Sequence, residues 1–201
     1  MQEVEGSDMK RAVETAANAG VDGLRRIDKG TVEVGPDLLS GVSLPAAVLH
    51  EEALAHNLAW MQHFADAHGA RLAPHGKTTM MPALFQRQLE AGAWGITLAT
   101  APQCRAAFAH GVRRLLMANQ LVGQATMAMV AELIATGADF YCVVDGVENV
   151  RQLGRFFAGR NLRLKVLIEL GVPGGRCGCR NQAAVEELAE AVAAEPALVL
   201  A

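Results

Sequence analysis

The sequence predicts an α/β protein built as a (β/α) barrel of the TIM type, incomplete at about its sixth strand. Short apolar runs alternate with helical stretches from residue 44 to the end of the 201-residue chain. The apolar runs are nearly continuous, which is typical of parallel strands covered on both faces. They recur at the spacing of βα units, and the Gly-rich first turn of the dinucleotide-binding fold is missing. These observations favour a barrel over an open, doubly wound sheet.

The polar N-terminal part predicts an extension rather than part of the barrel. Residues 1–43 contain one candidate helix, at 8–18, and no strong period after it. Residues 51–68 repeat apolar side chains at three- and four-residue steps, which predicts an amphipathic helix that ends at Gly69. We therefore expect an extension over 1–43 and a partial barrel over 44–201.

The remaining elements follow in regular alternation, and each helix connects two strands. Apolar runs predict the strands, and apolar side chains at helical spacing predict the helices between them. The expected strands are 71–74, 96–99, 115–118, 140–144, 164–169 and 198–200, and the expected helices are 82–91, 101–109, 124–136, 147–157 and 182–194.

A complete barrel has eight βα units and typically about 250 residues. This chain stops on the sixth expected strand, which would leave two strand edges unpaired. We therefore expect that the natural polypeptide is longer, or that the chain is a truncated product. Whether it is active by itself stays open.

Charge and composition exclude several classes of partner. A net charge of −3 and an isoelectric point near 6.1 provide no basic field for a nucleic acid. No stretch approaches the length of an apolar membrane span, and the N-terminus lacks an apolar signal core. Four cysteines suit reduced thiols inside the cell. We expect a cytoplasmic protein that binds neither nucleic acid nor membrane.

Segment 71–82 holds the densest cluster of unusual residues. It lies where the first expected strand ends, the face at which barrel active sites form. A lysine there is expected to be partly desolvated, which favours the neutral amine that attacks a carbonyl, so Lys77 could form a Schiff base. Gly76 permits a close backbone approach, and His75 places an imidazole beside the amine. A solvated loop lysine is the alternative.

A second glycine-rich stretch, at 171–178, follows the fifth expected strand. It misses the dinucleotide fingerprint because Pro173 stands in place of the second glycine. Arg176 within it could donate to a phenolate oxygen or a carboxylate at the barrel mouth, or be an ordinary surface arginine beside a turn. Cys177 and Cys179 lack the second pair of ligands that a zinc site needs, so no metal ligand is assigned.

Several motifs together carry a resemblance to a known family. They are LPAAVL at 44–49, PHGKT at 74–78, GAWGITLAT at 92–100, ANQLVG at 118–123 and GRCG at 175–178. In order and spacing they resemble the family of D-serine dehydratase and D-threonine aldolase, whose barrel is like the alanine racemase N-terminal domain. Within it, they are most similar to bacterial amino acid deaminases.

The resemblance implies an enzyme of fold-type III that depends on pyridoxal 5′-phosphate (PLP). It matches Lys77 to the lysine that forms the aldimine and Arg176 to an arginine near the cofactor ring, and it places His75 in the same pocket. Most phosphate-binding residues, the ligands of a divalent metal of the zinc or manganese class and a C-terminal β domain would lie beyond this chain. The full-length form could be a homodimer.

The implied reaction is β-elimination from D-serine or D-threonine, which gives ammonia and a 2-oxo acid. One alternative is a retro-aldol lyase of the D-threonine aldolase type, which would use the same Lys77. Another is a PLP-binding homeostasis protein without catalysis, or an inactive fragment.

Overall fold

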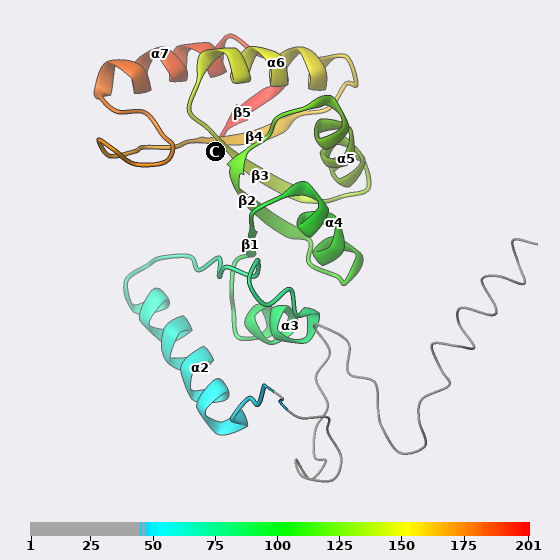
Figure 1. Cartoon of the computed structure of the whole chain (residues 1–201), viewed down its shortest axis with the longest axis vertical. Coiled ribbons are helices and arrows are strands. Elements are labelled where there is room, and N and C mark those ends of the chain that lie inside the picture. The colour runs from blue at the N-terminus through cyan, green and yellow to red at the C-terminus, as the bar shows by residue number, and fades with distance from the viewer. Residues whose placement is uncertain (1–44, 46) are drawn as a thin grey trace, which may run out of the picture.

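The computed structural model describes residue 45 and residues 47–201 (Figure 1). The expected extension over 1–43 and its helix at 8–18 lie outside the described residues. In the part described, helices and strands alternate along the chain as the sequence predicts. The helices are α2 (Glu51–Ala67), α3 (Pro82–Glu90), α4 (Ala101–Ala109), α5 (Gln124–Ala135), α6 (Val147–Ala158) and α7 (Gln182–Ala193).

The strands form one parallel sheet in the order of the sequence. They are β1 (Ile96–Leu98), β2 (Arg114–Gln120), β3 (Asp139–Val144), β4 (Leu164–Ile168) and β5 (Leu198–Leu200). Each strand pairs in parallel with the next, so the sheet order is β1-β2-β3-β4-β5. A sheet in which neighbouring strands are joined by single helices is the unit from which a (β/α) barrel is built.

Local sequence signals explain several of the helix ends. The Thr100 side chain accepts a hydrogen bond from the Gln103 N–H, and the Asn181 side chain accepts one from Ala184 N–H, so α4 and α7 begin at capping residues. Pro82 occupies the first position of α3, where no intrahelical N–H bond is lost. Gly137 follows α5 with φ +99°, a conformation that L side chains rarely adopt.

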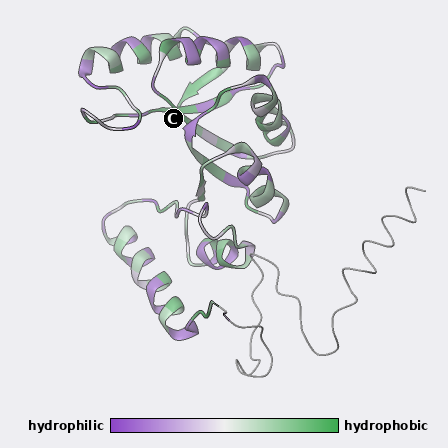
Figure 2. Cartoon of the chain, viewed as in Figure 1, coloured by the Kyte–Doolittle hydropathy of each residue, from purple (hydrophilic) through white to green (hydrophobic). Residues whose placement is uncertain are grey.

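The hydrophobic core lies between the sheet and helices α4 to α7. Leu115, Met117, Phe140 and Cys142 on β2 and β3 are buried, as is Leu153 of α6. The alternating hydrophilic and hydrophobic residues along α6 and α7 in Figure 2 are the amphipathic pattern that such packing requires.

The expectation that both faces of the sheet are covered is wrong for the described residues. Side chains along β2 and β3 alternate between buried and half-buried, because the helices pack on one face only. The other face carries a charged cluster in which Asp139 accepts hydrogen bonds from Arg114 Nε and Lys165 Nζ, both at 2.6 Å. In a closed barrel this face is the inside.

The first expected strand, at 71–74, is not a strand in the structure. It is an extended segment whose one bridge to the sheet is His75 with Thr97, where Thr97 N–H donates to Pro74 and Gly76 N–H donates to Thr97, both at 2.8 Å. Continuing this parallel ladder toward the N-terminus would require an N–H at position 74. Proline has none, so regular pairing stops there.

Candidate functional site

The carboxyl ends of the parallel strands bring the sequence-predicted residues to one edge of the sheet. The segment before Lys77 lies parallel to β1, as the parallel bridge between His75 and Thr97 shows. Lys77 therefore follows the carboxyl end of this segment. Arg176 lies in the loop that follows β4, at the same edge. Barrel enzymes build their active sites at this edge.

Lys77 opens a tight turn that projects beyond the sheet. Residues 77–79 form the turn, which is closed by a 2.9 Å hydrogen bond from Met80 N–H to the Gly76 carbonyl. Met80 has φ +44°, a strained value for a residue with a side chain. Lys77 is exposed, so the expected partial desolvation is wrong for the described residues. The reason is that the turn begins one residue beyond Gly76, the last residue bonded to β1.

Gly76 is required by packing beneath the turn. A Cβ at this position would lie 2.4 Å from a ring carbon of Phe85 and 3.0 Å from Ile96. Phe85, on α3, is 1% exposed. The close backbone approach expected at Gly76 is therefore an approach to the core side chains Phe85 and Ile96. This packing fixes the point at which the chain turns away from β1 at Lys77.

His75 pairs with β1 through its backbone while its side chain is exposed. Its partner Thr97 is buried, and the Thr97 hydroxyl donates to the Ala73 carbonyl at 2.7 Å. This pairing orders the backbone on the N-terminal side of Lys77. The role of His75 beside a cofactor stays a prediction.

The loop after β4 is a closed structure rather than an open turn. Leu170 bridges Cys179, and the Gly171 N–H donates to the Cys179 carbonyl at 2.9 Å. Arg176 lies within this loop and is exposed. The glycine-rich composition thus builds a loop that presents an arginine at the strand-end edge.

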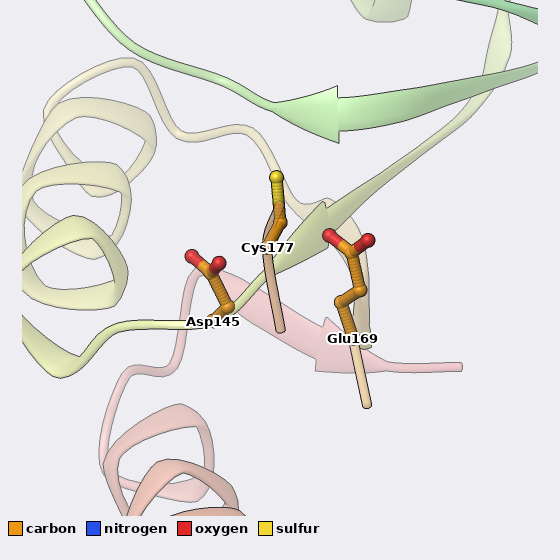
Figure 3. Close-up of side chains that lie close together, drawn as sticks. All are labelled: Asp145, Glu169 and Cys177. Carbon is orange, nitrogen blue, oxygen red and sulfur yellow. The ribbon is translucent and has the colours of Figure 1, made fainter. Parts of the chain in front are cut away.

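Three potential metal ligands meet at the same edge, and the sequence analysis did not single out two of them. The ligand atoms of Asp145, Glu169 and Cys177 all lie within 4.8 Å of one another, and Figure 3 shows the three side chains close together. Asp145 and Glu169 directly follow β3 and β4, a position that could have drawn attention to them. Each accepts a hydrogen bond from the chain itself, from Gly178 N–H and from Gln120 Nε2, both at 2.8 Å. We assign no ion to this cluster.

The buried cysteines are core residues. Burial raises the pKa of Cys104 and of Cys142 to about 12, so neither thiol ionises near neutral pH. Burial is also the main cause that raises the pKa of Cys179, followed by the nearby Asp145. These three thiols are poor nucleophiles.

Two cavities lie away from the strand-end edge. One of about 410 Å³ lies between α2 and α3, where Gln62, Asp66 and Arg87 line it. A second, of about 270 Å³, is enclosed mainly by apolar residues of α2, α3 and the extended segment, including Leu72 and Pro74. Neither of these two cavities is lined by Lys77 or Arg176.

The fold and the site define the class of this protein as a parallel (β/α) barrel domain with a lysine and an arginine at its strand-end edge. The chain belongs to the family described as alanine racemase, N-terminal domain, whose model matches residues 49–201.

Its relatives include enzymes of two reaction types. The chain is 32% identical over 154 residues to D-threonine aldolase of Arthrobacter sp. This alignment covers 77% of this chain and 40% of the relative. It is 32% identical over 142 residues to D-threo-3-hydroxyaspartate dehydratase of Delftia sp. (strain HT23). This alignment covers 71% of this chain and 37% of the relative. The chain therefore spans about 40% of the length of the first of these relatives.

Solved structures show the same similarity. D-threonine aldolase from Filomicrobium marinum matches with a TM-score of 0.76 at 29% identity, over 80% of this chain and 43% of that one. A variant of D-threo-3-hydroxyaspartate dehydratase in the metal-free form matches with a TM-score of 0.63 at 32% identity. This match covers 68% of this chain and 36% of that one. The predicted family and fold class are thus confirmed.

Within the described residues, no helix combines the length and the apolar character needed to cross a bilayer.

Proposed function

We propose that the protein carrying this chain is a PLP-dependent lyase that dehydrates D-hydroxy amino acids such as D-serine or D-threonine. The observation that carries the proposal is the exposed amine of Lys77 at the same strand-end edge as the guanidinium of Arg176. The relatives named above, two aldolases and a dehydratase, support the substrate class.

The chain's own donors fit PLP. A primary amine is the group that binds an aldehyde covalently, and a guanidinium suits a phenolate or phosphate oxygen. Lys77 would hold the aldehyde carbon, Arg176 would donate to the ring oxygen, and His75 would flank the amine. The carboxylates of Asp145 and Glu169 are already bonded within the chain, which lessens their repulsion of an anionic ligand.

The residues of this chain would act on the substrate in two ways. PLP, when bound, supplies an electron sink for negative charge at the substrate Cα. The Nζ of Lys77 would be the group that moves the proton at that carbon, because it is the amine proposed to hold the aldehyde. Arg176 would keep the ring in one orientation. A divalent metal, whose ligands the family resemblance assigns to a region outside this chain, would supply Lewis acidity toward the β-hydroxyl.

D-threonine aldolase activity is the second candidate, and the similarity to two D-threonine aldolases favours it. The motif ANQLVG at 118–123, which resembles the deaminases, favours dehydration. Product analysis separates the two reactions. Incubation of the protein with PLP, metal and D-threonine should yield 2-oxobutanoate and ammonia. Glycine and acetaldehyde as the main products would select the aldolase reaction.

A further inference from the structure

The loop over residues 170–180 holds Arg176 between two fixed carbonyl groups. We propose that Arg180 and Asp145 are positioning residues that orient Arg176 toward PLP before the cofactor arrives. This inference rests on the proposed function, because it assigns Arg176 to the cofactor.

Arg180 bonds to the chain on both sides of Arg176. Its Nη2 donates to the Gly175 carbonyl and its Nη1 to the Cys177 carbonyl, each at 2.6 Å. These short, charge-assisted bonds come from one planar guanidinium, which fixes the two carbonyls relative to each other. The backbone of Arg176 lies between them and is restrained from both directions.

Asp145 completes the restraint from the neighbouring strand end. Its Oδ2 accepts a 2.8 Å hydrogen bond from the Gly178 N–H. The peptide group that joins Cys177 to Gly178 is therefore held at its oxygen by Arg180 and at its nitrogen by Asp145. Because Asp145 follows β3, this contact ties the loop to the sheet.

The glycines of the loop make room for this arrangement. A Cβ on Gly171 would lie 1.8 Å from Arg180 Nη1 and 2.1 Å from the Cys177 carbonyl oxygen. Gly178 has φ +93°, and a Cβ there would lie 2.5 Å from the Gly171 nitrogen. These two glycines let the Arg180 guanidinium lie inside the loop, which gives the stretch a role other than a nucleotide fingerprint.

A restrained loop changes how Arg176 binds an anion. The Arg176 side chain is exposed, while Gly175 and Cys177 on either side are held. A donor whose backbone is already ordered loses less conformational entropy when it binds its acceptor. Removing the restraint should therefore weaken the binding of PLP even though Arg176 is still present.

The first experiment measures the rate of amide hydrogen exchange in the loop over residues 170–180 of the PLP-free protein. Arg180→Leu should speed exchange in the peptide that covers 170–180 by about tenfold, the size expected for losing a charge-assisted hydrogen bond. Gly171→Ala should do the same, because its Cβ displaces a guanidinium that is still present. Arg160→Leu is the matched control, since Arg160 also donates to a carbonyl, that of Phe156, at the end of α6. Unchanged exchange in both loop variants would overturn the proposal.

The second experiment measures the affinity for PLP by absorbance titration. It compares the unchanged protein, the two single variants and the double variant as a double-mutant cycle. Arg176→Gln and Arg180→Leu should each weaken PLP binding by about tenfold. The double variant should lose no more than Arg176→Gln alone, because Arg180 acts through Arg176, and Arg180→Lys should restore part of the affinity. Additive losses would mean that Arg180 acts independently of Arg176, and they would overturn the proposal.

The two experiments separate failure of this inference from failure of the proposed function. If Arg176→Gln binds PLP as tightly as the unchanged protein, the assignment of Arg176 is wrong and its positioning falls with it. If Arg176→Gln loses affinity while Arg180→Leu changes neither exchange nor affinity, the positioning alone is wrong and the proposed function stands.

Discussion

The ring of Phe85 packs directly against the backbone of Gly76, so the last bonded residue before Lys77 is seated on the hydrophobic core. A Cβ at Gly76 would overlap the ring at 2.4 Å. The backbone that carries the proposed cofactor lysine is thereby tied to α3 as well as to β1. The position of Lys77 thus depends on core packing.

Gly76→Ala should destabilise the fold and weaken PLP binding together. The added methyl group must displace the Phe85 ring, and overpacking of this kind costs about 1–3 kcal/mol in the free energy of unfolding. Urea unfolding and a PLP titration measure the two effects. Gly159→Ala is the control, because Gly159 has φ −62° and an added Cβ would meet its neighbours at an ordinary 3.5 Å or more. Equal stability of the two variants would contradict the packing argument.

Lys77 should be the lysine to which PLP is attached. Borohydride reduction of the protein with bound PLP, followed by peptide mapping, should place the label on Lys77, and Lys77→Ala should abolish the label. The described residues provide a matched control in Lys165. Hydrogen bonds from its ammonium to Asp139 and to Tyr141 raise the pKa of Lys165, so its amine stays protonated. Label on Lys165 would refute the assignment.

Asp139 should stabilise the fold in a pH-dependent way. Desolvation favours the neutral acid, but hydrogen bonds from Lys165 and Arg114 outweigh it and hold the pKa of Asp139 below its usual value. A carboxyl with a lowered pKa contributes stability above its unfolded pKa, and this contribution is lost as the pH falls through the folded value. Asp139→Asn should therefore cost about 1 kcal/mol in the free energy of unfolding at pH 7.

The difference between the unchanged protein and Asp139→Asn should shrink as the pH is lowered below about 4, the usual pKa of an aspartate. Urea unfolding at pH 7 and pH 3 tests this. Glu148→Gln is the control, because Glu148 pairs with Arg155 at 3.5 Å on the exposed face of α6 and should cost less than about 0.5 kcal/mol. A loss for Asp139→Asn that is the same at both pH values would contradict the electrostatic explanation.

Removing metal should suppress dehydration while PLP binding persists. The metal would act on the β-hydroxyl of the substrate, whereas PLP would be attached to Lys77. Dehydration can therefore be lost while PLP binding is kept. Chelation should lower the yield of 2-oxobutanoate from D-threonine by at least about tenfold, and adding back zinc or manganese should restore it. Full activity after chelation, with metal removal verified by elemental analysis, would show that the dehydration does not depend on metal.

Much of the fold could be predicted because its signals are local. Thr100 caps α4 and Asn181 caps α7 with side-chain bonds to residues three positions ahead, and the predicted starts of these helices at 101 and 182 are confirmed. The segment at 71–74 was harder to predict. Its apolar character suggested a strand, but the missing N–H of Pro74 matters only once the segment lies beside β1.

The sequence by itself determined the order of the helices and strands, the parallel βα alternation and the presence of a lysine where a strand-like segment ends, since each depends on residues close together in the chain. Only the tertiary structure decided which side chains meet at the strand-end edge. Asp145, after β3, reaches Gly178 in the loop after the neighbouring β4, and Gln120 at the end of β2 reaches across the end of β3 to Glu169 after β4. Contacts between residues far apart in the sequence depend on strand register and loop closure, which leave no periodic signal along the chain.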